Sequence, residues 1–322
     1  MSDLTGKSIG GGSGAGAMKA AYAVSELIAQ NGKTFLYKAI QAGNNQEVFI
    51  KYFQLDEINP EIAQKICAQF EVEAQILVEI SHPSMASAID YGFYEENPFL
   101  VMKFVQGKTI ETMLGKPVPT GETTKILGPV SRAFNYANKK GVSLRDIHPG
   151  NIWINQVGES ILTAYAPPSE AEMTQPSEPS ASGGAFTRPN YTAPEQWSGN
   201  VSEQSDIYSL GIVTYELITG QKLFAQDTPE GVIQAQAEGI TPQPTQFVPD
   251  LSEDVQNVIA SALAADPAER YTDGSKMAIL FERISHRETS WYTEQLQETT
   301  EIKAKSKKLP LQWIIIGAVA VV

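Results

Sequence analysis

The residues best suited to chemistry lie in one short stretch, Leu144-Arg145-Asp146-Ile147-His148-Pro149-Gly150-Asn151. Asp146 offers a carboxylate that can accept a proton, and Asn151 offers an amide oxygen that can bind a hard cation. Thirteen residues after Asn151 the chain reads Ala164-Tyr165-Ala166. The methyl group at position 164 cannot bind magnesium, which takes oxygen ligands at about 2.0 to 2.1 Å. The stretch therefore offers a proton acceptor and one oxygen ligand for a cation, to which Ala164 adds none.

Other motifs flank this stretch in a fixed order. Val48-Phe49-Ile50-Lys51, Glu73 and Phe99-Leu100-Val101-Met102-Lys103 precede it, and Tyr191-Thr192-Ala193-Pro194-Glu195, Asp206 and Asp266-Pro267-Ala268-Glu269-Arg270 follow it. In this order they resemble the motifs of bacterial eukaryotic-like (Hanks-type) serine/threonine protein kinases, over about residues 25 to 285. The chain is identified as a degenerate, pseudokinase-like member of that family.

The resemblance implies roles for the residues of the first half. Lys51 matches the lysine that contacts the α and β phosphates of ATP, and Glu73 matches the glutamate that pairs with it. Glu71 lies about 200° around the helix from Glu73, so only one of the two can face Lys51, and Glu73 has the family's spacing. Lys103 and Val105 match the hinge, whose backbone would meet the adenine.

The resemblance also implies a catalytic loop. Asp146 would be the base, and Asn151 would be the second metal ligand and the only one left, because Ala164 replaces the expected aspartate. His148 stands where the family has the lysine that neutralises the transferring phosphate. With an ordinary pKa of about 6.5, it would be mostly neutral at pH 7.

The phosphate-binding glycine loop is degraded as well. Its three glycine positions fall on Ala29, Asn31 and Thr34, whose side chains would crowd phosphates that bare backbone amides should hold. ATP remains a possible ligand, whereas Mg²⁺ is doubtful.

Four residues match structural positions of the family. Arg145 matches the arginine that elsewhere pairs with a phosphorylated activation loop. Glu195 and Arg270 match a buried ion pair, and Asp206 matches the aspartate that orients the catalytic loop through backbone hydrogen bonds. Tyr165 can pack as the family's phenylalanine does.

The elements that must position these residues follow from periodicity. Runs at 27–29, 35–37 and 48–52 alternate with turn residues and predict a β-meander. Ile62, Ile66, Phe70, Ala74 and Leu77 form one helical stripe within 60–80, and strand-like patterns return at 87–92 and 99–105. Beyond Gly107 the pattern is mainly helical, with a buried helix at 207–218. We expect an α+β, bilobal protein-kinase-like fold with a small β-rich lobe and a larger helical lobe.

Composition excludes several classes. A net charge of −13 and a pI near 4.8 argue against a nucleic-acid partner, which needs clustered Lys and Arg. The single cysteine, Cys67, excludes a disulfide framework and a cysteine-based zinc site, and we expect it to lie in the core.

The chain divides by composition. Residues 167–188 are rich in Pro, Ser and Glu and predict a flexible acidic segment. Lys303, Lys305, Lys307 and Lys308 precede an apolar run shorter than the roughly 20 residues of a membrane span. We expect a flexible leader at 1–22, a kinase-like domain at 23–285 (N-lobe 23–103, hinge 103–107, C-lobe 108–285), a basic juxtamembrane linker at 286–308 and the start of a truncated transmembrane helix at 309–322.

The resulting hypothesis is a membrane-anchored, single-pass protein with a cytoplasmic kinase-like domain. It would act on protein partners in signalling or assembly as a pseudokinase with weak or no phosphoryl transfer. One alternative is an active atypical serine/threonine kinase that uses Asp146 and Asn151. The other is a small-molecule kinase, since the His-Pro-Gly-Asn sequence also resembles aminoglycoside phosphotransferases.

Overall fold

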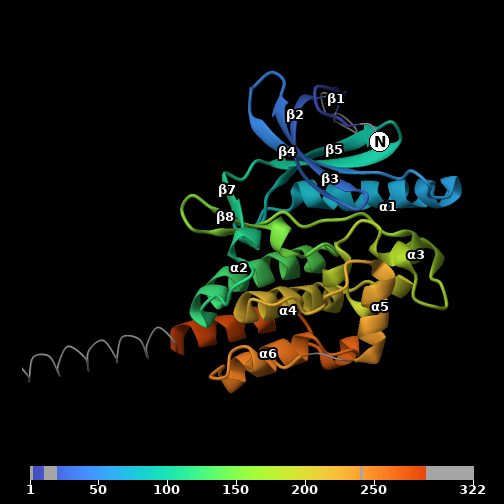
Figure 1. Cartoon of the computed structure of the whole chain (residues 1–322). Coiled ribbons are helices and arrows are strands. Elements are labelled where there is room, and N and C mark those ends of the chain that lie inside the picture. Colours follow the sequence, from blue (N-terminus) through green and yellow to red (C-terminus); the bar gives the residue numbers. More distant parts are fainter. Residues whose placement is uncertain (1–2, 11–19, 240–241, 288–322) are drawn as a thin grey trace, which may run out of the picture.

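One antiparallel sheet forms the upper lobe in Figure 1, a computed structural model that describes residues 3–10, 20–239 and 242–287. Its six strands run in the order β1-β2-β3-β4-β6-β5. Their bounds are β1 Ser8–Gly10, β2 Ala21–Asn31, β3 Thr34–Gln41, β4 Glu47–Phe53, β5 Ala88–Tyr94 and β6 Asn97–Lys103. The predicted meander and the two later strands are confirmed.

The expected flexible leader is wrong for residues 3–10. Strand β1 pairs with β2 in the register Ile9↔Tyr22, and Leu4 and Ile9 are fully buried against the sheet. Two apolar side chains are enough to hold a short strand on a sheet edge, because each removes its whole surface from water. The rest of the expected leader, apart from the start of β2, lies outside the described residues.

Helix α1, Pro60–Glu79, lies under this sheet. The Asn59 side chain accepts a hydrogen bond from the Glu61 amide and Pro60 takes the first helical position, both common ways to start a helix. The predicted stripe is confirmed, because Ile66, Phe70 and Leu77 are buried. Glu73 is buried on the same side, and this placement brings it toward the lower lobe.

The lower lobe is helical, as expected. Helix α4, Glu203–Thr219, is buried on nearly all sides, so the prediction of a central helix is confirmed. Around it lie α2 Thr120–Lys139, α5 Pro229–Glu238, α6 Glu253–Ala262 and a last helical stretch at 274–287. A small sheet of β7 Gly107–Thr109, β8 Ile152–Asn155 and β9 Ser160–Leu162 lies between the lobes.

The segment 167–188 is structured, which corrects the expectation of a flexible loop. It contains α3, Glu170–Thr174, which starts with a capping box between Ser169 and Glu172. Gly183, Gly184 and Phe186 are buried farther along. Composition suggested a solvated loop, but the small glycines let the chain approach Trp197 closely, with Phe186 as an apolar anchor.

The predicted structural contacts in the lower lobe are confirmed. Asp206 accepts hydrogen bonds from the backbone amides of Leu144 (3.2 Å) and Arg145 (3.0 Å). Arg270 pairs with Glu195 through two bonds of 2.7 and 2.9 Å. The Asp206 bonds fix the backbone at Leu144 and Arg145 to α4, and the Arg270 bonds fix the segment at Glu195 that precedes α4.

The expected linker and transmembrane helix at 286–322 lie outside the described residues, apart from the end of the last helical stretch. Within the described residues, 3–10, 20–239 and 242–287, no helix is both long and apolar enough to cross a membrane.

Replacing Arg270 by Gln should lower the free energy of unfolding by about 3 to 5 kcal/mol, because it leaves the mostly buried Glu195 carboxylate unpaired. Arg132 is the matched control, since its pair with Glu282 is about half exposed and Arg132→Gln should change stability by less than about 1 kcal/mol. Urea unfolding of both variants measures the difference, and equal losses would contradict the assigned role.

Candidate functional site

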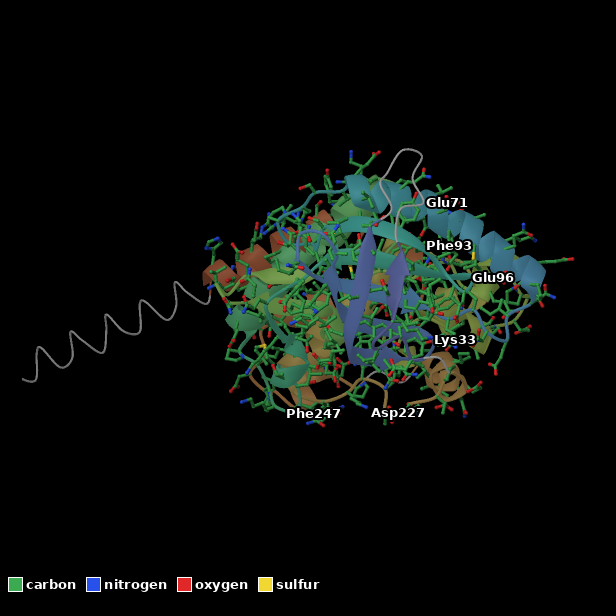
Figure 2. All side chains as sticks on the ribbon, turned by 90° about the horizontal axis from the view of Figure 1, so that it is seen from above. Lys33, Glu71, Phe93, Glu96, Asp227 and Phe247 are labelled. Carbon is green, nitrogen blue, oxygen red and sulfur yellow. The ribbon has the colours of Figure 1, made fainter. Side chains whose placement is uncertain are left out.

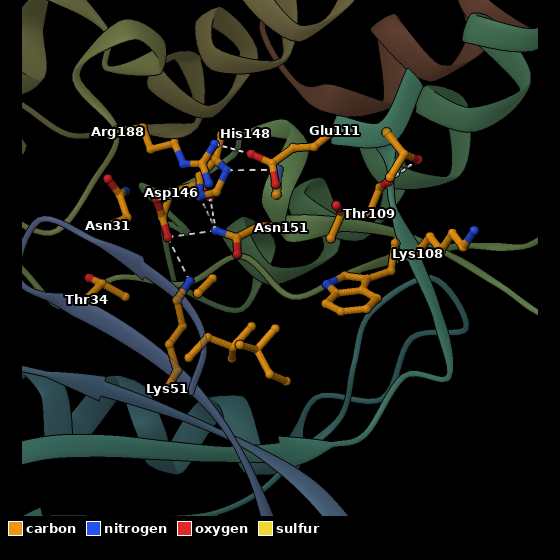
Figure 3. Close-up of a pocket in the computed structure, with 16 residues that line it drawn as sticks. Asn31, Thr34, Lys51, Lys108, Thr109, Glu111, Asp146, His148, Asn151 and Arg188 are labelled. Atoms are coloured by element: carbon orange, nitrogen blue, oxygen red, sulfur yellow. Dashed lines mark hydrogen bonds and ion pairs between the residues drawn. The ribbon is translucent and has the colours of Figure 1, made fainter. Parts of the chain in front are cut away.

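Lys51, Asp146 and Asn151 form a closed group between the lobes (Figure 3). Lys51 Nζ on β4 donates to Asp146 Oδ2 at 2.7 Å, and both side chains are almost fully buried. Asn151 Nδ2 donates to the same oxygen at 2.7 Å and to the Asp146 carbonyl at 2.9 Å. Burial raises the pKa of the Asp146 carboxyl, and the bonds from Lys51 and Asn151 act in the opposite direction.

His148 is buried beside this group. Its Nδ1 accepts a hydrogen bond from the Gly150 amide at 3.0 Å, and its Nε2 lies 2.8 Å from Asn151 Nδ2 and 3.5 Å from Asp146 Oδ1. Burial lowers the pKa of the His148 imidazole well below 6.5, and Arg188 and Lys51 lower it further. The ring is therefore neutral at pH 7 and supplies no positive charge.

Glu73 does not pair with Lys51, which corrects the sequence prediction. Arg145 holds the Glu73 carboxylate through two bonds of 2.9 Å, Nη1 to Oε2 and Nη2 to Oε1. The Tyr165 hydroxyl donates to Glu73 Oε2 at 3.0 Å. The helix glutamate is thus bound to the lower lobe, and Lys51 is bound to Asp146.

Two residues of the Ala164-Tyr165-Ala166 stretch explain this exchange of partners. Ala164 leaves no carboxylate near Lys51, whose buried charge then takes the closest anion, Asp146. Tyr165 packs against Phe53 and Phe70 with ring centroids 6.0 and 6.2 Å apart, as expected of an apolar spine. Its hydroxyl adds a donor for Glu73 that a phenylalanine would lack.

Arg145 also binds the segment after Tyr165. Its Nε lies 3.0 and 3.1 Å from the two carboxylate oxygens of Glu172 on α3. The Arg145 backbone has φ +66, a left-handed conformation that costs a non-glycine residue about 1 kcal/mol or more. The bond from its amide to Asp206 and the two ion pairs hold that conformation. In this structure a glutamate therefore occupies the arginine that the resemblance assigns to a phosphorylated loop.

Part of the glycine-loop region is fastened to the segment below it. Thr34 Oγ1 donates to the Phe186 carbonyl at 2.9 Å, and the Lys33 amide donates to the Ala185 carbonyl at 3.4 Å. A side chain at Gly32 would come within 3.1 Å of the same Ala185 oxygen. The turn between β2 and β3 therefore closes down on the lower lobe.

A cavity of about 280 Å³ remains between the turn and the catalytic loop. Three of its side chains carry buried polar atoms that have no hydrogen-bond partner among the described residues: Asn31 Nδ2, Asp146 Oδ1 and Trp153 Nε1. Arg188 pairs with Glu111 at its rim (Figure 3). The lining residues are Ile28, Ala29, Asn31, Thr34, Leu36, Lys51, Lys108, Thr109, Glu111, Thr112, Asp146, His148, Gly150, Asn151, Trp153 and Arg188.

An aromatic cluster joins Trp153, which lines this cavity, to Phe104 in the predicted hinge. The Phe49 ring, fully buried on β4, lies 4.7 Å from the Phe104 ring and 5.1 Å from the Trp153 ring, centroid to centroid. Neither Lys103 nor Val105 lines the cavity, and the Lys103 amide donates to the Ser87 carbonyl at 2.9 Å. The structure thus brings Lys51, Asp146, His148 and Asn151 together and leaves Glu73, Lys103 and Val105 outside the group.

The residues do not fit the metal that the family uses. The Asp146 Oδ2 atom already accepts from Lys51 and Asn151, and Asn151 directs its Nδ2 rather than its oxygen at Asp146. The described part of the chain holds no cluster of three or more His, Cys, Asp or Glu residues that could bind a metal ion.

Sequence reasoning missed several residues of the site. Glu172 on α3, Glu111 in a 3-10 turn at Ile110–Met113 and Arg188 belong to segments whose path the sequence does not indicate. Phe49 and Trp153 did leave a signal, since Phe49 is a large aromatic residue inside the Val48–Lys51 motif and Trp153 stands two residues after Asn151. The Tyr165 hydroxyl was visible as well, but its partner was not.

The neutral state of His148 predicts a dependence of stability on pH. A folded-state pKa below the unfolded value means that the unfolded chain binds more protons, so acid destabilises the fold by about 1.4 kcal/mol per pH unit below about pH 6.5. The native chain should therefore lose its advantage in free energy of unfolding over the His148→Gln variant as the pH falls, by about 1.4 kcal/mol for each pH unit below about 6.5. Urea unfolding of both chains between about pH 7.5 and 5.5 measures this. If Asp146 kept the ring charged, the difference would instead hold or grow on acidification.

Comparison with known proteins agrees with this architecture. The family model described as "Protein kinase domain" matches residues 22–286. Serine/threonine-protein kinase PknA of Mycobacterium tuberculosis is 29% identical over 266 residues, 80% of this chain and 59% of that protein. Probable serine/threonine-protein kinase PknB of Lactococcus lactis is 30% identical over 236 residues, 71% of this chain and 36% of that protein. The chain thus spans from about a third to three fifths of the length of these relatives.

Solved structures show the same fold. The PknI kinase domain of Mycobacterium tuberculosis superposes with a TM-score of 0.62 at 21% identity, covering 81% of this chain and 95% of that one. Rad53 in complex with AMP-PNP gives a TM-score of 0.61 at 20% identity, covering 80% of this chain and 64% of that one. The chain therefore belongs to the protein kinase domain family and is related to bacterial serine/threonine kinases.

Proposed function

We propose that this domain is a pseudokinase, which acts by binding protein partners in signalling or assembly and transfers little or no phosphate. One observation carries the proposal: the buried ion pair between Lys51 and Asp146, at 2.7 Å. In an active kinase the lysine contacts the nucleotide phosphates and the aspartate accepts the substrate proton. Here each of the two occupies the other.

The ion pair is difficult to open. Separating two buried charges leaves each in an environment that solvates it poorly. Removing one partner of a buried ion pair typically costs about 3 to 5 kcal/mol of stability, because the other charge stays buried without a counter-charge. Ala164 offers Lys51 no alternative carboxylate, and Glu73 is held by Arg145 and Tyr165. A neutral His148 adds no charge that could take over the role of Lys51.

The space for a nucleotide also supports the proposal. The Phe49 ring packs against both Phe104 of the hinge segment and Trp153 of the cavity lining, close to where the resemblance places the adenine. A cavity of about 280 Å³ beyond them is at the small end of the roughly 300 to 1,000 Å³ typical of ligand sites. The residues therefore do not fit ATP bound in the family's manner.

We extend the proposal to location. The order of Lys303, Lys305, Lys307 and Lys308 before an apolar run that contains Trp313 is typical of the cytoplasmic side of a membrane anchor. The kinase-like domain would then work next to a membrane, where its partners assemble. Membrane fractionation of the full chain tests this, and recovery in the soluble fraction alone would contradict it.

The native chain should incorporate no more radiolabel from γ-labelled ATP than the Asp146→Ala variant, with magnesium or manganese present. The reason is that Asp146 is bound to Lys51 and no carboxylate stands at position 164. A reproducible excess in the native chain, on itself or on a protein substrate, would favour an active atypical kinase and end the proposal.

Opening the aromatic cluster should create nucleotide affinity. The Phe49→Ala/Trp153→Leu variant removes two rings of the cluster, so ATP without magnesium should bind it and raise its thermal midpoint. At an ATP concentration of a hundred times Kd, the free energy of unfolding should increase by about 2.7 kcal/mol. The native chain should show no shift, and inorganic tripolyphosphate, which lacks the base, should shift neither chain. An equal ATP shift in the native chain would show that the rings do not block the base.

A further inference from the structure

A groove of about 870 Å³ runs between α1, the loop after β4 and the turn that joins β5 to β6. Leu55, Ile58, Ala63, Cys67 and Phe93 give it an apolar floor. Figure 2 shows Phe93 between Glu71 and Glu96 on the side of the upper lobe along which α1 runs. The groove lies outside the site between the lobes and shares no lining residue with its cavity.

The rim of the groove is acidic. Asp56, Glu57, Glu71, Glu95 and Glu96 line it, and no lysine or arginine does. All of these carboxylates except that of Glu71 belong to residues well exposed to solvent. Lys33, which does not line the groove, places its Nζ 3.8 Å from Glu57 Oε2. Several like charges around an apolar floor produce a negative potential that attracts cations.

The walls of the groove are built in advance. The mostly buried Asn97 side chain joins two of them, because its Oδ1 accepts from the Leu55 amide at 2.7 Å and its Nδ2 donates to the Glu95 carbonyl at 2.9 Å. The third wall, α1, is held from its inner face by the Glu73 contacts to Arg145 and Tyr165. A rigid groove loses little conformational freedom when a partner binds.

We propose that this groove docks a partner protein through a cationic segment that carries large apolar side chains between its lysine or arginine residues. Apolar side chains on the floor would contribute about 25 cal/mol per Å² of surface removed from water. The basic residues would face the five carboxylates, which speed encounter and select the partner. Nucleic acids and anionic lipid surfaces carry the same sign of charge as the rim, so the complementary partner is a basic protein segment.

This inference rests on the proposed function in one respect, because a domain whose output is binding needs a surface for it. The two can fail separately. Phosphate transfer above the Asp146→Ala level would end the pseudokinase proposal and leave the groove measurement unaffected. A groove that binds nothing cationic would leave the transfer result unaffected.

Cys67 provides a direct probe, since it is the only cysteine of the chain and lies half-buried on the floor. Burial raises the pKa of its thiol, so alkylation by iodoacetamide is best followed at mildly alkaline pH. The probe ligand is a short synthetic helix of lysine and leucine with its leucines on one face. At saturation it should slow alkylation of Cys67 in the full chain at least about fivefold, because a bound segment excludes the reagent from the floor.

Matched variants separate the groove from the overall negative charge. Glu95→Gln/Glu96→Gln should weaken binding of the lysine-leucine peptide at least about tenfold, measured by fluorescence anisotropy at about 0.15 M salt. Glu230→Gln/Glu253→Gln removes the same charge from exposed positions on α5 and α6 and should leave the affinity unchanged. A peptide with glutamate in place of lysine should not protect Cys67.

Three results would overturn the proposal. Equal weakening by both double variants would reduce the binding to nonspecific charge attraction. Protection of Cys67 that rises with protein concentration, without peptide, would make a second copy of this chain the occupant. Faster alkylation in the Lys303→Gln/Lys305→Gln/Lys307→Gln/Lys308→Gln variant, again without peptide, would make the chain's own basic segment the occupant.

Discussion

The rule that a buried charge needs a partner governs the centre of this molecule. Lys51, Glu73, Arg145 and Asp146 are all removed from solvent where the two lobes meet, and each is paired. Because position 164 carries a methyl group, the lysine lacks a carboxylate there and takes Asp146. Glu73 is then left to Arg145, whose planar fork of donors can serve Glu73 and Glu172 together. The missing acid at position 164, the Tyr165 hydroxyl and the fork of Arg145 together account for the arrangement of all four charges.

This pairing links the lobes in a way that opposes turnover. Helix α1 is tied through Glu73 to the loop at Arg145 and to Tyr165, and the Thr34 side chain at the start of β3 is tied to the Phe186 carbonyl. Bonds of this kind favour one relative position of the lobes, whereas phosphoryl transfer depends on lobes and loops that close and reopen around substrates. A rigid body with a preformed groove on the outer side of α1 is suited to binding. The proposed loss of phosphoryl transfer and the proposed docking surface are therefore both consistent with the same fixed helix.

Much of the site could be predicted from single residues because motif spacing constrains the backbone. Asp146, Asn151, Asp206 and the Glu195–Arg270 pair lie where their positions in the sequence imply, since each belongs to a short segment whose local path is set by turns, caps and helix periodicity. The pairing of Lys51 with Glu73 failed because partner choice is a competition among all nearby charges. The leader and the segment 167–188 failed for a related reason: composition reports average solvation, whereas Leu4, Ile9 and Phe186 each found a specific apolar site.

The sequence by itself determined the family, the bilobal α+β architecture and the absence of a carboxylate at position 164, because these depend on residue identity and on spacing along the chain. Only the tertiary structure decided which buried charges pair, that Phe49 meets both Phe104 and Trp153 beside the cavity, and that five carboxylates gather around one groove. Electrostatic and packing energies depend on distances between residues far apart in the chain, and those distances exist only once the lobes have folded against each other.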